Sequence, residues 1–197
     1  MFECRHRPLA LPQALLTELA TSYGEPHRAY HTATHVAEVL AWYDQVADDL
    51  GWSHAADVYV AIVFHDAIYV PGARDNEARS AAWARAAGLA IDHDRVTHLI
   101  ELTARHGKLA PTDVDAETAR FLDCDMAILG SEPAAFDAYD AAIAIEYRHV
   151  PHDAYLAGRR AFLTGLLASP RIFLSDYFHT RLDARARANL ARVMARP

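Results

Sequence analysis

The feature that most constrains this chain is its abundance of residues that favour helix and its scarcity of residues that break it. Alanine supplies 40 of the 197 residues, whereas Gly and Pro number only 8 and 9. Alanine has the highest helix propensity of the natural residues, and Gly and Pro have the lowest. No segment of useful length alternates apolar and polar residues as a half-buried strand would. The composition therefore predicts an all-α protein.

The few Gly and Pro residues mark the joints between the predicted helices. The sequence shows no internal repeat, no low-complexity linker and no domain boundary. It predicts one domain over residues 1–197, a helical bundle of about eight or nine helices. The predicted helices cover residues 12–23, 32–50, 53–70, 75–87, 92–106, 113–129, 132–149, 151–168 and 183–195.

Charge and hydropathy limit the classes of partner. The chain carries 19 Lys and Arg against 26 Asp and Glu, a formal net charge of −7. Nucleic-acid backbones and anionic membranes select for basic faces, so neither is expected as the main partner. The longest nearly apolar run, residues 58–70, is too short to span a bilayer, and the N-terminus does not resemble a signal peptide. Because two cysteines are also too few for a disulfide scaffold, we expect a cytoplasmic protein and leave its oligomeric state open.

Two ionisable residues interrupt the most apolar predicted helix, residues 53–70. His65 and Asp66 are adjacent inside it. Adjacent helical side chains point about 100° apart, so these two could hold a single ion beside the helix. A buried carboxylate is normally paired, hydrogen-bonded or bound to a metal. A His and an Asp bonded to the backbone or to Arg are therefore the alternative.

A second apolar run, residues 121–129, contains two more carboxylates. Asp125 shares a helical face with Phe121 and Leu129, and this spacing predicts that it points inward. Asp123 falls on another face, from which it could reach solvent or Arg120. The alternative for Asp125 is a helix cap or a buried salt bridge.

A pair of histidines marks the start of the predicted helix 32–50. His31 and His35 are four residues apart and lie on one helical face. His35 continues into the apolar stripe of Val39 and Val46, while His31 lies one turn earlier, at the mouth of any cleft. Imidazoles and carboxylates together suit most first-row transition metals.

Taken in order, these residues resemble the H…HD…D signature of the HD superfamily of metal-dependent phosphohydrolases, which are all-α. The sequence looks most like the small stand-alone predicted HD phosphohydrolases, over roughly residues 25–190. An HD dipeptide alone is common, whereas the ordered set in helical context is more specific. The segments that carry the resemblance are Arg28-x-Tyr30-His31-x-x-x-His35-Val36, Phe64-His65-Asp66-Ala67 and Asp123-Cys124-Asp125.

The resemblance implies a metal site and a reaction. His35, His65, Asp66 and Asp125 would be the ligands of a divalent ion, which could be Mn, Fe, Co, Ni or Zn. The ion would activate water and polarise a phosphoryl oxygen. Asp66 could also orient the attacking water or accept its proton.

Further residues are candidates for binding the substrate or assisting catalysis. Arg28 and His31 precede the first ligand, and Arg159 shares a stripe with Phe162 that could point inward. The alternative for Arg159 is a salt bridge with Glu146 or another acid. His106, at the end of the helix 92–106, is the best candidate for an extra ligand or a contact with phosphate. Glu77 could be a general acid or could compensate the charge of a helix start.

These observations predict a metal-dependent hydrolase of a phosphate ester or pyrophosphate bond in a small phosphorylated metabolite, a nucleotide being one candidate. Two alternatives stay open. One is a two-iron oxygenase of HD type, which needs more inward histidines. The other is a non-catalytic binding or regulatory module that is stabilised by its metal.

Overall fold

A computed structural model describes residues 2–196. Over this range the chain forms nine α-helices and two short 3-10 helices and contains no strand, which confirms the all-α prediction. Residues up to Arg105 and residues from His106 onward form two compact units. The division falls beside Gly107, and no change in composition marks it. One domain over the whole chain stays a prediction.

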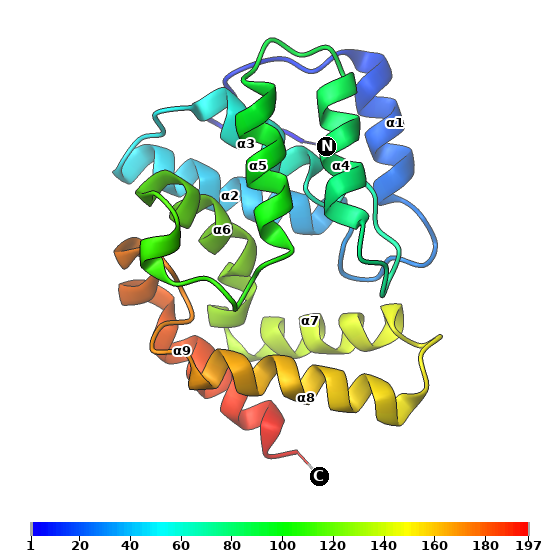
Figure 1. The fold of residues 1–197 in the computed structure, drawn as a ribbon, viewed down its shortest axis with the longest axis vertical. Helices are drawn as coiled ribbons and strands as arrows, with labels where there is room; N and C mark the ends of the chain where they lie inside the picture. Colours follow the sequence, from blue (N-terminus) through cyan, green and yellow to red (C-terminus); the bar gives the residue numbers. More distant parts are fainter. Residues whose placement is uncertain (1, 197) are drawn as a thin grey trace. The chain divides into compact units, whose positions relative to one another are not determined.

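The first unit is built around one buried helix, α3. Eight of its ten residues are buried, and it packs against α2, α4 and α5. Figure 1 shows α4 and α5 side by side, with α3 close to both. The helices of this unit are α1 (Gln13–Tyr23), α2 (Ala33–Asp49), α3 (Ala55–Phe64), α4 (Asn76–Ala86) and α5 (His93–Thr103).

Helix α3 ends at Phe64, six residues earlier than the sequence predicts. Side chains of α4 bond to the backbone that a longer helix would have used. The Ser80 hydroxyl accepts from the Ile68 amide at 3.0 Å, and the Asn76 amide bonds both the N–H and the C=O of Val70 at 3.0 Å. Because these backbone groups are satisfied outside a helix, the chain turns here. His65 and Asp66 therefore lie at the end of α3 and in the following turn, not within the helix.

The second unit is arranged around η2. This short segment packs against α6, α7 and α9. Helix α9 begins at Asp176, seven residues earlier than predicted, because the Ser175 hydroxyl accepts from the Phe178 amide at 3.3 Å and caps the helix. The elements are η1 (Pro111–Asp113), α6 (Ala116–Met126), η2 (Ala127–Gly130), α7 (Pro133–Glu146), α8 (His152–Ala168) and α9 (Asp176–Met194).

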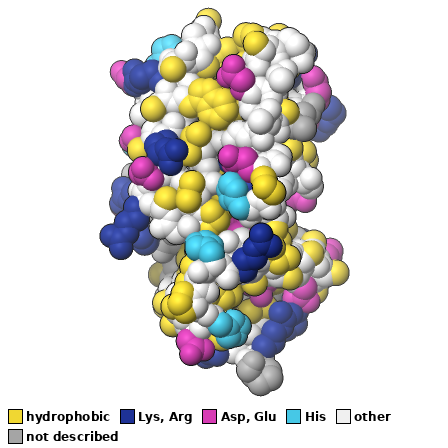
Figure 2. Space-filling model, turned by 90° about the vertical axis from the view of Figure 1, so that its right-hand side faces the viewer, with side chains coloured by type: hydrophobic (Ala, Val, Ile, Leu, Met, Phe, Trp, Pro, Cys, Tyr) yellow, Lys and Arg dark blue, Asp and Glu magenta, His cyan; other side chains and the backbone are white. Residues whose placement is uncertain are grey.

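Two features of the described residues, the helices and the exposed charges on one face, bear on the expected partners. Each helix within residues 2–196 is too short or too polar to cross a membrane. On the face shown in Figure 2, Lys and Arg side chains lie apart from one another, interspersed with acidic and apolar ones.

Candidate metal-binding site

Three of the predicted ligands converge in the first unit. The two Nε2 atoms of His35 and His65 lie 3.1 Å apart. The Asp66 carboxylate oxygen Oδ2 lies 2.9 Å from Nε2 of His65 and 3.6 Å from Nε2 of His35. Two ligands that each lie about 2.1 Å from one ion are about 3.0–3.4 Å apart at octahedral and tetrahedral angles. The 3.1 and 2.9 Å separations are close to this range, and the 3.6 Å separation between His35 and Asp66 is slightly wider.

The hydrogen bond made by Nδ1 of His65 supports the interpretation of this residue as a metal ligand. Its Nδ1 lies 2.8 Å from the carbonyl oxygen of Ile62, which can only accept, so Nδ1 carries the proton. When the ring is neutral, its Nε2 presents a lone pair toward a carboxylate and a second imidazole. Lone pairs that meet in this way repel unless a cation, either a proton or a metal ion, lies among them. The imidazole orientation fixed through the other ring nitrogen is also typical of metal-bound histidines.

Both histidines are nearly inaccessible, whereas the carboxylate reaches the surface. The side chains of His35 and His65 are each 2 % exposed, and that of Asp66 is 18 % exposed. His35 lies in the first turn of α2, whose start is capped by Thr32. The two imidazoles are therefore shielded from solvent, and the carboxylate is the part of the group that solvent reaches.

His31 lies beside this group, as the sequence predicts. Its ring stacks on that of Tyr69, with ring centres 4.1 Å apart, and its centre lies 6.0 Å from that of His35. The side chain is half-buried. Sequence reasoning missed Tyr69, because only the turn after α3 brings this residue back toward His31.

Arg28 is not placed to bind a phosphate. Its side chain is 0 % exposed, and each of its five N–H groups has an acceptor within the first unit. The prediction that it contacts substrate is therefore corrected. The sequence showed its position before His31 but not that a turn of the backbone would cover it.

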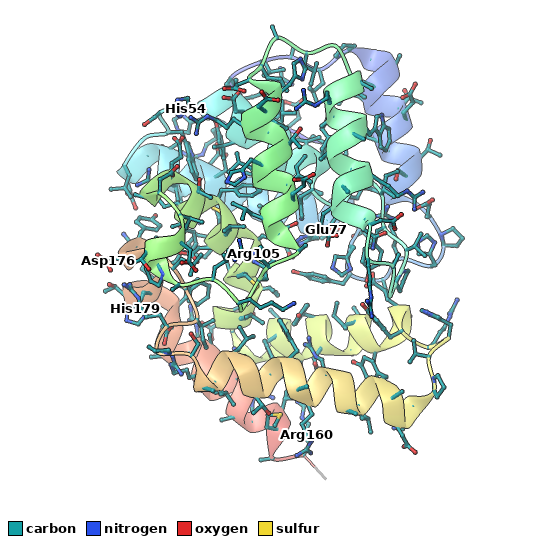
Figure 3. The ribbon with its side chains drawn as sticks, in the orientation of Figure 1. His54, Glu77, Arg105, Arg160, Asp176 and His179 are labelled. Atoms are coloured by element: carbon teal, nitrogen blue, oxygen red, sulfur yellow. The ribbon has the colours of Figure 1, made fainter. Side chains whose placement is uncertain are left out.

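Glu77 lies in the first turn of α4 (Figure 3) and is half-buried. Among the described residues, the group that could together hold an ion consists of His35, His65 and Asp66. Glu77 is not a member, so its role as a general acid stays a prediction. The neighbouring Asn76 bonds both backbone groups of Val70.

Asp125 and His106 form a pair in the second unit. The Nε2 atom of His106 lies 2.7 Å from Oδ2 of Asp125, and the two side chains are 18 % and 15 % exposed. The sequence predicts that His106 ends the helix 92–106. In the structure α5 ends at Thr103, so His106 lies after the helix. Because His35, His65 and Asp66 belong to the other unit, Asp125 as a fourth ligand and His106 as an extra one stay predictions.

The assignment of the two carboxylates to faces of α6 was wrong. Asp123 is 1 % exposed, whereas Asp125 is only half-buried. Asp123 accepts from the Leu174 and Ser175 amides, at 2.8 and 2.7 Å, and from the Ser175 hydroxyl at 2.6 Å. Burial raises the pKa of Asp123 to about 6, although these hydrogen bonds oppose the rise. The residues that bury it follow some 50 positions later, so helical periodicity could not reveal them.

Arg159 points inward and forms a salt bridge with an acid, the alternative weighed in the sequence. The guanidinium donates to Oδ1 of Asp140 at 3.1 and 2.8 Å and to the Tyr139 hydroxyl at 3.2 Å. Its side chain is 11 % exposed. The salt bridge is thus made with Asp140 rather than with Glu146. A contact between Arg159 and a substrate stays a prediction.

In comparisons with known proteins, no family model, curated protein or solved structure matches the chain. The interpretation of the site therefore depends on the geometry and chemistry of its own residues. The resemblance to the HD superfamily stays a prediction carried by the ordered set of His and Asp residues.

Proposed function

We propose that this protein binds a divalent transition-metal ion through His35, His65 and Asp66 and hydrolyses a phosphate ester or pyrophosphate bond. The observation that carries the proposal is the convergence of two imidazole Nε2 atoms and one carboxylate oxygen within 4.8 Å of one another. With the proton on Nδ1, the Nε2 atom of His65 is the ring nitrogen that faces His35 and Asp66. Two imidazoles and a carboxylate accept Mn, Fe, Co, Ni or Zn.

Each of these residues has a distinct task. A bound ion would activate water and polarise a phosphoryl oxygen. His35 and His65 hold their rings in a buried setting in which water cannot compete. Asp66 is the most exposed of the three, so its carboxylate can orient a water molecule or accept its proton. His31 lies at the edge of this group and is our candidate for contact with the substrate there.

The substrate we propose is a small phosphorylated metabolite. The acidic balance of the chain and the scattered cations on the face in Figure 2 favour a small substrate over a nucleic-acid strand. His106 and Arg159 in the second unit, and Glu77 in the first, stay candidates for the substrate and the leaving group. Asp125 stays the candidate for a fourth ligand.

A metal-supplemented screen of phosphorylated metabolites tests the proposal. We expect one or more compounds to release phosphate with Mn²⁺, Fe²⁺, Co²⁺, Ni²⁺ or Zn²⁺, and the double variant His65→Ala/Asp66→Ala to be inactive. Release that persists in the double variant would refute the assigned centre. Metal binding without turnover of any compound would favour a metal-stabilised binding module, and metal-dependent oxygen uptake would favour an oxygenase.

A further inference from the structure

One guanidinium joins the two segments that carry the three proposed ligands. Nη1 of Arg28 donates to the carbonyl oxygens of His31 at 2.9 Å and Asp66 at 2.7 Å. Nη2 donates to the carbonyl oxygen of Ala67 at 3.1 Å. His31 belongs to the segment that leads into α2 and His35, whereas Asp66 and Ala67 form the turn after α3. One planar group therefore bonds directly to both segments.

The remaining contacts hold this guanidinium in a fixed orientation. Nε donates to the Glu25 carboxylate at 3.0 Å, and Nη2 donates also to the Ser22 hydroxyl at 3.3 Å. The rings of Tyr23 and Tyr69 lie 5.1 and 5.5 Å from its central carbon. With every N–H group bonded and aromatic rings beside it, the side chain is pre-organised for one arrangement of the backbone.

We propose that Arg28 is a positioning residue for the metal site, which fixes the separation between His35 and the His65–Asp66 turn. The inference rests on the proposed function, because it takes these three residues as the ligands. Ligand atoms must be held within about half an ångström of a productive geometry, and neighbouring groups that orient them set much of the metal affinity. Lysine cannot replace arginine here, because its ammonium presents three donors at a point rather than a planar fork.

The variant Arg28→Lys tests this role while keeping the charge. We measure Co²⁺ affinity and the visible absorption spectrum of the bound ion, which reports ligand geometry. The expected result is a Co²⁺ affinity about 10–100-fold weaker than that of the wild type, with an altered spectrum. Unchanged affinity and an unchanged spectrum would overturn the inference.

The chain offers a matched control in Arg187, in the second unit. Its guanidinium also caps backbone carbonyls, those of Leu167, Ser169 and Pro170, and pairs with a carboxylate, that of Asp183. Arg187→Lys should lower the melting temperature but leave Co²⁺ affinity within about twofold. An equal loss of affinity in both variants would show a general effect of destabilisation and would count against the role of Arg28.

Two further measurements keep the inference testable. If Arg28→Lys does not fold, Ser22→Ala removes a milder link, because the Ser22 hydroxyl accepts from Nη2 and donates to the Ala67 carbonyl. It should weaken Co²⁺ binding about threefold to tenfold, and no change would overturn the inference. If the wild type binds no Co²⁺, the proposed function fails. In that case the NMR signals of the His35 and His65 rings, compared between the wild type and the Arg28 or Ser22 variant, test the positioning role without metal. Loss of the positioning contact should shift both signals, and unchanged signals would contradict the role of Arg28.

Discussion

At the scale of single residues, His65 shows how a backbone contact prepares a side chain for chemistry. The Ile62 carbonyl, three residues earlier and within α3, accepts a hydrogen bond from Nδ1, and Nε2 faces Asp66. The end of α3 supplies both the carbonyl and the change of direction that brings Asp66 round. One residue thus serves as the last contact of a buried helix and as a candidate ligand.

Asp183 gives a prediction about pH at the same scale. Burial alone would raise the pKa of Asp183, but hydrogen bonds from the Ile172 amide at 2.7 Å and the Arg187 guanidinium at 2.6 Å outweigh it and lower the pKa. The folded state thus favours the ionised form more than the unfolded state does. This contribution to stability is present above about pH 4 and is lost as the pH falls through the pKa of the folded state.

Asp183→Asn should therefore lower the free energy of unfolding at pH 7 by about 1.5–3 kcal/mol. The difference from the wild type should shrink as the pH falls below about 4 toward the lowered pKa of the folded-state carboxylate. Urea unfolding from pH 3 to pH 7 measures both effects. A difference that stays constant over this range would contradict the assignment.

At the scale of elements, the end of α3 depends on Asn76 in α4. This side chain is 8 % exposed and bonds both backbone groups of Val70. Asn76→Ala should cost about 1–3 kcal/mol, because a backbone donor and a backbone acceptor lose their partner. Faster hydrogen exchange of the Val70 amide would locate the effect. Arg79→Ala on the exposed face of the same helix should change stability by less than about 0.5 kcal/mol, and an equal loss there would contradict the explanation.

The contact between η2 and α9 gives a second prediction for elements. A Cβ atom added at Gly130 would lie 2.6 Å from Cβ of Leu182 and 3.0 Å from its carbonyl oxygen. Gly130→Ala should therefore push the two segments apart and destabilise the protein by about 1–3 kcal/mol. At Gly165, within α8, an added Cβ meets no atom within 4 Å, so Gly165→Ala should stabilise by about 0.5–1 kcal/mol. Thermal unfolding of both variants checks these predictions. A change in melting temperature of the same sign in both variants would contradict them.

At the scale of the whole molecule, the sequence predicted the helices better than it predicted their ends and inward faces. Composition and joints located all nine helices of the described residues within a few positions, apart from the end of α3 and the start of α9. Helical periodicity is a local signal and could not show that Ser175 would cover Asp123. The side chains of Arg28 and Asn76 bond to distant turns, and such contacts become readable only once the helices are packed.

Amide hydrogen exchange along the full chain can follow the two units separately, and it therefore tests the proposed metal site. Adding Co²⁺ should slow amide exchange in the first turn of α2 and in the turn after α3, because a shared ion ties His35 to His65 and Asp66. The variant His35→Ala should show no such change at the same Co²⁺ concentration. Slower exchange in α6 as well would support Asp125 as a further ligand. Unchanged exchange at both first-unit segments would mean that the three converging side chains bind no ion.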